Sequence, residues 1–159
     1  MFQRILLALD SGDAAAVASC FTVALARSGA ASVHVVHVNE RLIGAFGLSA
    51  EPPDEGADVV TEALRDMRAA GVPATGATYA TTPFDVAPAI ADVAEQWRAD
   101  VIVLGSRRRR VGPVLRASMR DKIARATPLP VLTAPAPLRV GRRARAPQAT
   151  PTPLDSRIH

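Results

Sequence analysis

Four consecutive arginines and two short segments that follow apolar runs contain the residues that could bind a charged ligand. Arg107–Arg110 offers four guanidinium groups, which form paired hydrogen bonds with phosphate. Gly105-Ser106 precedes them, and a glycine lets backbone N–H groups approach a phosphate closely. Asp10 follows an apolar run, and its carboxylate could contact a ribose or an adenine, or could cap a helix. Together these residue types could bind a phosphorylated ligand if the fold brings them close. The alternative is that Arg107–Arg110 is a solvated basic loop that binds no ligand.

The segments between these residues predict an α/β fold. Apolar, β-branched runs alternate with amphipathic segments, which is typical of a parallel sheet built from βαβ units. In such a sheet, ligands bind beyond the carboxyl ends of the strands, where the strand order reverses. Asp10, Val38 and Gly105 fall at three such ends, and the helix that follows the loop after Ser106 adds free N–H groups. The predicted strands are 4–9, 32–38, 74–81, 99–105 and 130–133, and the predicted helices are 11–29, 54–70, 83–97 and 115–126.

Several side chains are predicted to be structural rather than functional. Cys20, Phe21 and Trp97 lie among apolar residues at helical spacing and are expected in the core, with Val17, Cys20, Phe21 and Ala24 on one helix face. His34 and His37 are three residues apart on a strand, so they face opposite sides of the sheet and no shared metal is expected. No catalytic residue is assigned, because the sequence contains no nucleophile elbow, Walker loop or zinc motif.

Composition and length place the chain among soluble domains. It has 159 residues, of which 48% are hydrophobic and 21% charged, and no apolar run approaches the roughly 20 residues of a membrane span. The short apolar run near the N-terminus does not resemble a secretory signal, and a single cysteine excludes an internal disulfide. We therefore expect a cytoplasmic protein without membrane contact. Residues 1–134 are predicted to form the domain, and the Pro/Arg-rich residues 135–159 a disordered tail.

Charge is segregated along the chain. Up to Leu104 there are six arginines against thirteen acidic residues, whereas from Gly105 onward twelve arginines and one lysine face only Asp121 and Asp155. A basic C-terminal part favours an anionic partner. Nucleic acid is the weaker candidate for that partner, because no aromatic residue follows Trp97 and none is available for base stacking.

Four segments resemble the universal stress protein family. They are Leu6-Ala8-Leu9-Asp10, Val35–Val38, the sequence ADVIVLGSR at 99–107 and Pro128–Leu132, and the resemblance covers about residues 3–134. It implies an open five-stranded parallel sheet in the order 3-2-1-4-5 with helices on both faces, a Rossmann-like layout of the adenine nucleotide alpha hydrolase type. It also implies a homodimer, often paired through the last strand. That strand is short, apolar and expected at the sheet edge, so we predict pairing centred on Val131–Thr133.

One branch of this family binds ATP through a glycine pattern: Gly, two residues, Gly, nine residues, then Gly with Ser or Thr. Here Gly105 matches the first glycine and Arg108 replaces the second. The third falls on Ser118 by direct counting, or on Ala117 with Ser118 as the hydroxyl after one deletion. The second register is preferred because it also aligns Lys122-Ile123 with a basic–aliphatic pair. The resemblance thus implies nucleotide contacts at Asp10, Val38, Gly105, Ser106, Arg108, Gly112, Ala117 and Ser118, with Mg²⁺ present only if ATP is bound.

The leading hypothesis is a dimeric, stress-responsive regulatory protein that binds ATP or another adenine nucleotide weakly and is not an enzyme. Arg108 is the reason for expecting weak binding, since a long side chain occupies the space that glycine leaves for phosphate. The alternative is a member of the family that binds no nucleotide and acts through contacts with other proteins. A third hypothesis is sequence-independent association with nucleic acid through the basic end.

Overall fold

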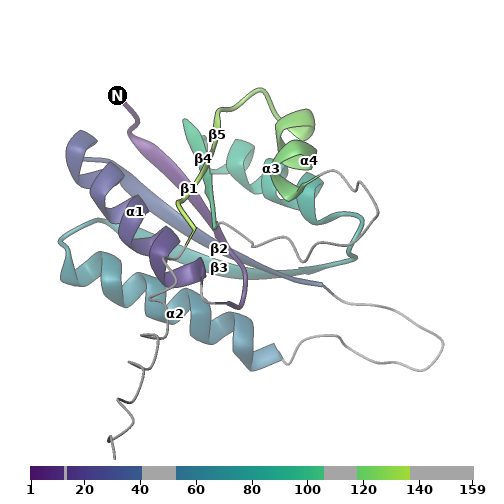
Figure 1. The fold of residues 1–159 in the computed structure, drawn as a ribbon, viewed down its shortest axis with the longest axis horizontal. Helices are drawn as coiled ribbons and strands as arrows, with labels where there is room; N and C mark the ends of the chain where they lie inside the picture. The colour runs from purple at the N-terminus through teal and green to yellow at the C-terminus, as the bar shows by residue number, and fades with distance from the viewer. Residues whose placement is uncertain (13, 41–52, 106–117, 137–159) are drawn as a thin grey trace, which may run out of the picture.

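Five parallel strands form a single sheet between two pairs of helices (Figure 1). The computed structural model describes residues 1–12, 14–40, 53–105 and 118–136. The strand order is β3-β2-β1-β4-β5, which confirms the predicted topology. The strands are β1 (Arg4–Leu9), β2 (Ser32–Glu40), β3 (Ala74–Thr81), β4 (Val101–Leu104) and β5 (Val131–Thr133), and the helices are α1 (Ala14–Gly29), α2 (Pro53–Ala69), α3 (Val86–Gln96) and α4 (Met119–Ala126).

The central strand β1 is buried on both faces because every residue from Ile5 to Leu9 is apolar. Ile5 pairs with Val33 of β2 and with Val101 of β4, so the three most apolar strands lie side by side. Alternate side chains of these strands enter two separate cores. Ile5, Leu7 and Leu9 pack with α1 and α2 on one face, and Leu6 and Ala8 pack with α3 and α4 on the other.

Some element boundaries differ from the prediction. Strand β2 continues two residues beyond Val38, because its end remains paired with β3 as far as Thr81. Helix α3 begins at Val86 and not at Pro83, since Thr82 and Asp85 form a turn in which the Thr82 hydroxyl donates to the carboxylate at 2.6 Å. Helix α4 begins at Met119, because its N-cap Ser118 has extended backbone angles. The ends of β4 and β5 are shorter than predicted by one or two residues.

The buried face of α1 is a correction to the sequence interpretation. Cys20 is exposed, and Ala24 is exposed as well, whereas the buried residues of α1 are Ala14, Ala18, Ser19, Thr22 and Ala26. Small side chains let α1 lie close to the strands, so the larger Phe21 is only half-buried at the flank of the core. Trp97, also predicted as core, is half-buried and packs at the edge of the second core.

The amino ends of β1 and β4 are joined by a carboxylate. Asp100 accepts hydrogen bonds from the backbone N–H groups of Gln3 and Arg4, at 2.7 and 2.8 Å. These two hydrogen bonds lower the pKa of the Asp100 carboxyl. The Arg4 guanidinium lies 4.9 Å from the centre of the Trp97 ring, which stacks on His34 at 5.5 Å. This cluster is at the end of the sheet opposite to Asp10 and Gly105.

Candidate functional site

A cavity of about 330 Å³ lies at the carboxyl ends of β1, β2 and β4. Its volume is at the lower end of the range of small-molecule sites, roughly 300–1,000 Å³. The cavity lies in the crevice beside β1, where the strand order reverses. Ligands of parallel sheets with this topology bind in that crevice. The lining residues are Ala8, Leu9, Asp10, Val38, Val86, Ile90, Leu104, Gly105, Ser118, Met119, Arg120 and Thr133.

Four of the predicted site residues meet in this cavity. Asp10 follows β1, Val38 is near the end of β2, Gly105 follows β4 and Ser118 precedes α4. The other four, Ser106, Arg108, Gly112 and Ala117, lie outside the described residues. The convergence of Asp10, Val38, Gly105 and Ser118 from four separate elements follows from the parallel strand order, which gathers the carboxyl ends at one edge.

The cavity lining combines apolar and charged side chains. The apolar ones include Val38, Val86, Ile90 and Met119, and Asp10 and Arg120 bring opposite charges. Sequence reasoning did not assign a ligand role to Val86, Ile90, Met119, Arg120 or Thr133. Val86 and Ile90 read as core residues of α3, and only the tertiary structure shows that the same side chains border the cavity.

Gly105 contributes backbone to the cavity, and its lack of a side chain is not required for space near α1. A Cβ placed at Gly105 would point toward α1, at 3.7 Å from the Ala14 Cβ and 3.8 Å from the Ala18 Cβ. These are ordinary van der Waals distances. The fold therefore accommodates alanine at position 105, and the small α1 side chains create this room.

The start of α4 is already capped by its own side chains. The Ser118 hydroxyl accepts from the Asp121 N–H at 3.2 Å and donates to the Asp121 carboxylate at 2.7 Å, which also accepts from the Ser118 N–H at 3.2 Å. These hydrogen bonds lower the pKa of the Asp121 carboxyl, so it remains negatively charged at neutral pH. The hydroxyl that the glycine pattern would place near phosphate is thus engaged in a capping box.

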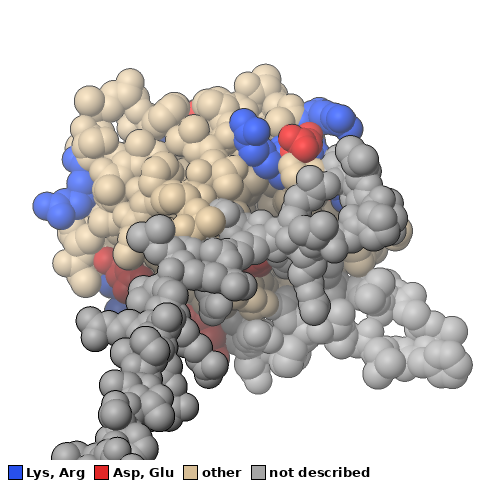
Figure 2. Space-filling view, viewed as in Figure 1, with Lys and Arg blue, Asp and Glu red and all other residues tan. Residues whose placement is uncertain are grey.

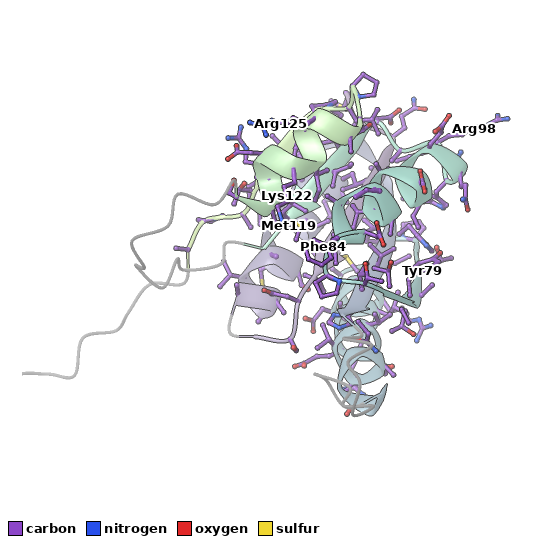
Figure 3. All side chains as sticks on the ribbon, turned by 90° about the vertical axis from the view of Figure 1, so that its right-hand side faces the viewer. Tyr79, Phe84, Arg98, Met119, Lys122 and Arg125 are labelled. Atoms are coloured by element: carbon purple, nitrogen blue, oxygen red, sulfur yellow. The ribbon has the colours of Figure 1, made fainter. Side chains whose placement is uncertain are left out.

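Basic side chains surround that carboxylate. Figure 2 shows blue side chains on α4 with a red one between them, and α4 carries Arg120, Lys122 and Arg125 besides Asp121. In Figure 3, Lys122 and Arg125 lie on α4, above Met119, while Phe84 and Tyr79 lie on the segments below. Of the basic residues on α4, Arg120 lines the cavity. Among the described residues, an anion in the cavity would therefore meet the Arg120 guanidinium and the Asp10 carboxylate, with Asp121 nearby on α4.

The two strand histidines face opposite sides of the sheet, as predicted. His37 is buried, and its Nδ1 donates to the Leu9 carbonyl at 3.0 Å, beside α2. His34 stacks on Trp97 on the other side, where burial lowers its pKa. Among the described residues, no three His, Cys, Asp or Glu side chains are grouped to hold a metal ion. No helix within those same ranges is long and apolar enough to cross a membrane.

Comparisons with known proteins agree with this arrangement. A model of the Universal stress protein family matches residues 1–135. This chain belongs to the universal stress protein family. A universal stress protein family member from Burkholderia pseudomallei has a similar structure, with 25% identity and a TM-score of 0.66, over 84% of this chain and 96% of that one. A search of curated proteins finds no match.

Two further solved structures with the same fold contain a nucleotide. The universal stress protein from Archaeoglobus fulgidus in complex with dAMP is 22% identical, with a TM-score of 0.63, over 84% of this chain and 98% of that one. A universal stress protein family protein from Arabidopsis thaliana with AMP bound is 17% identical, with a TM-score of 0.58, over 85% and 92% of the two chains. At these identities the likeness shows the fold that this universal stress protein shares with them.

Proposed function

We propose that this universal stress protein binds an adenine nucleotide in the cavity beside Asp10 and acts in a stress response as a binding protein rather than an enzyme. The observation that carries the proposal is the convergence of Asp10, Val38, Gly105 and Ser118 on one cavity of about 330 Å³. The structures with dAMP and AMP bound support adenine nucleotides as the ligand class.

The cavity lining suggests how the nucleotide would lie. The Asp10 carboxylate accepts hydrogen bonds, which suits the hydroxyls of a ribose or the amino group of an adenine. The apolar side chains Val38, Val86 and Ile90 suit the faces of a base. Arg120 and the backbone at Gly105 would then face the phosphates. The Asp121 carboxylate at the start of α4 opposes a highly charged phosphate chain, so the expected affinity is low.

Isothermal titration calorimetry with ATP, ADP and AMP tests this proposal on the full chain. We expect binding to all three, and Asp10→Ala should weaken each of them by about tenfold or more, because a hydrogen bond to a charged group is lost. Asp92→Ala removes an exposed carboxylate from α3, outside the cavity lining, and is the matched control, expected to bind like the unmodified protein. Absence of binding to every nucleotide at millimolar concentration in low salt would refute the proposal.

The alternative function, action through protein contacts without nucleotide, is favoured by one observation. The capping box satisfies the N–H groups of Ser118 and Asp121 at the start of α4 without a ligand. If calorimetry detects no binding of ATP, ADP or AMP, capture of partner proteins by the intact chain becomes the relevant assay.

A further inference from the structure

A second cavity, of about 280 Å³, lies between α1 and α2, which cover the face of the sheet opposite to α3 and α4 (Figure 1). Small side chains of α1, those of Ala15, Ala16 and Ser19, line one side of it, and side chains of α2 line the other. Because these α1 side chains are short, they do not fill the space up to α2. The nucleotide cavity is bordered by α3 and α4, so the two cavities lie on opposite faces of the sheet.

Two carboxylates of α2 border this second cavity, those of Glu62 and Asp66. They are four residues apart on the helix, so they share one side of it, with about 5–6 Å between their Cβ atoms. Both side chains are exposed, and neither forms an ion pair or a hydrogen bond with another described residue. Like charges at this spacing repel each other and destabilise a helix. A cation bound between them would remove that repulsion, so the pair favours a positively charged ligand.

A buried hydroxyl completes the polar part of the lining. Ser19 is 2% exposed, and it borders the cavity from α1. Within the part of the chain that the structure describes, its hydroxyl has no hydrogen-bond partner, not even the carbonyl one turn back that helical serines commonly use. A buried hydroxyl that stays unpaired destabilises the fold, and a ligand that forms a hydrogen bond with it removes this penalty. Ser19 therefore points to a ligand independently of the two carboxylates.

The chemistry of the lining matches a primary ammonium group on an aliphatic chain. An ammonium group carries three N–H donors and no acceptor, and the cavity offers it two carboxylates and one hydroxyl. The apolar side chains of Leu9, Val59 and Ala63 also line the cavity and suit a stem of methylene groups. A divalent metal ion fits less well, because it takes six or more oxygen ligands. Among the described residues, no three His, Cys, Asp or Glu side chains are grouped here or elsewhere.

We propose that the cavity between α1 and α2 binds a small aliphatic amine in its ammonium form. The ammonium N–H groups donate to the carboxylates of Glu62 and Asp66 and to the hydroxyl of Ser19. The carbon chain lies against the apolar side chains of the lining. This amine site is separate from the nucleotide cavity, so its test needs no nucleotide and its failure would leave the proposed function untouched.

Isothermal titration calorimetry of the full chain with butylammonium chloride tests the amine site. A ligand of this size that forms three hydrogen bonds should bind with a Kd of about 1 mM. Tetramethylammonium carries the same charge but has no N–H donor, so at equal ionic strength it should bind at least about tenfold more weakly. Equal binding of the two cations, or no binding of butylammonium at about 20 mM, would overturn the proposal.

Substitutions at the lining locate the bound amine. Asp66→Asn keeps the size of the side chain and removes one charge, and it should weaken butylammonium binding by about tenfold. Asp58→Asn makes the same change at an exposed carboxylate of α2 outside the cavity lining, and it should alter the affinity by less than about twofold. Equal losses in the two variants would mean that the cation is attracted by the net charge of α2, and would contradict a defined site.

Two further measurements separate this site from other cation sites. Ser19→Ala removes the buried hydroxyl and should weaken butylammonium binding by about fivefold, in a variant that circular dichroism shows to be folded. Full affinity in Ser19→Ala would contradict the proposed geometry. Titration with magnesium chloride should show no binding that depends on Asp66. If Mg²⁺ binds more tightly than butylammonium and Asp66→Asn abolishes its binding, the cavity is a metal site and the proposal is wrong.

Discussion

Gly56→Ala should destabilise the protein although alanine favours helices. Gly56 is in the first turns of α2, and a Cβ there would lie 2.4 Å from His37 Cδ2 and 2.6 Å from Asn39 Oδ1. Carbon atoms normally approach to about 3.5–4.0 Å, so the helix or the strand must move by about 1 Å. His37 cannot swing aside, because its side chain is buried and bonded to the Leu9 carbonyl.

The expected magnitude combines two opposing effects. Overpacking of this kind costs about 1–3 kcal/mol, and replacing glycine by alanine within a helix returns at most about 1 kcal/mol. The net loss in the free energy of unfolding is therefore about 1 kcal/mol, which lowers the melting temperature by about 3–4 °C. The matched control is Gly12→Ala, where no atom lies within 4 Å of the added Cβ. It should raise stability by about 0.4–1 kcal/mol through the unfolded state.

Thermal and urea unfolding of both variants, followed by circular dichroism, measure these changes. The free energies of unfolding of the two variants should shift in opposite directions, although both replace glycine by alanine. Equal stabilisation by both alanines would refute it, because it would mean that α2 is not held against His37 and Asn39 as closely as the structure shows. A Gly56→Ala variant that binds ATP normally would further show that the end of β2 tolerates the displacement.

Three other predictions concern charged groups. Burial lowers the pKa of His34, so this imidazole binds a proton more readily in the unfolded chain than in the folded one. The free energy of unfolding should therefore fall as the pH drops through 6.5. In His34→Gln, the urea midpoint should depend less on pH in that range. The pKa of the Asp100 carboxyl is lowered, so its contribution to folding stability is present at neutral pH and is lost in acid. Asp100→Asn should therefore lower the melting temperature at pH 7 but hardly at pH 2. Asp121→Asn removes the negative charge at the start of α4. In low-salt calorimetry it should tighten ATP binding more than AMP binding. Unchanged affinities would argue against phosphates bound near α4.

The fold class and most strands were predictable because they depend on local patterns, whereas the strand order followed from the family resemblance. A continuous apolar run such as Ile5–Leu9 is buried on both faces only in the middle of a parallel sheet, and the weaker run at Ala74–Thr81 belongs at an edge. Boundaries were less predictable where one hydrogen bond decides them. The Thr82–Asp85 turn delays α3, and the extended backbone of Ser118 delays α4, and neither leaves a signal in apolar periodicity.

The buried face of α1 shows where pattern reading fails. Hydrophobicity alone favours Val17, Cys20 and Phe21 as core residues, yet α1 turns Ala14, Ala18 and other small residues to the sheet. The distance between helix and sheet selects side-chain size, and that distance is a property of the packed structure. A row of small residues at helical spacing was the only available signal, and it competes with the larger apolar residues beside it.

The amino-acid sequence alone predicts the order of elements, the position of Asp10, Val38 and Gly105 at strand ends, and the family resemblance, because each depends on neighbouring residues or short motifs. The packed fold is needed to show that Val86, Ile90 and Met119 border a cavity, since this depends on elements distant in sequence. The same holds for Ser118. The glycine pattern places its hydroxyl near a phosphate, whereas in the fold the hydroxyl donates a hydrogen bond to the Asp121 carboxylate. A side chain's role is set by what surrounds it, and most of those neighbours come from elsewhere in the chain.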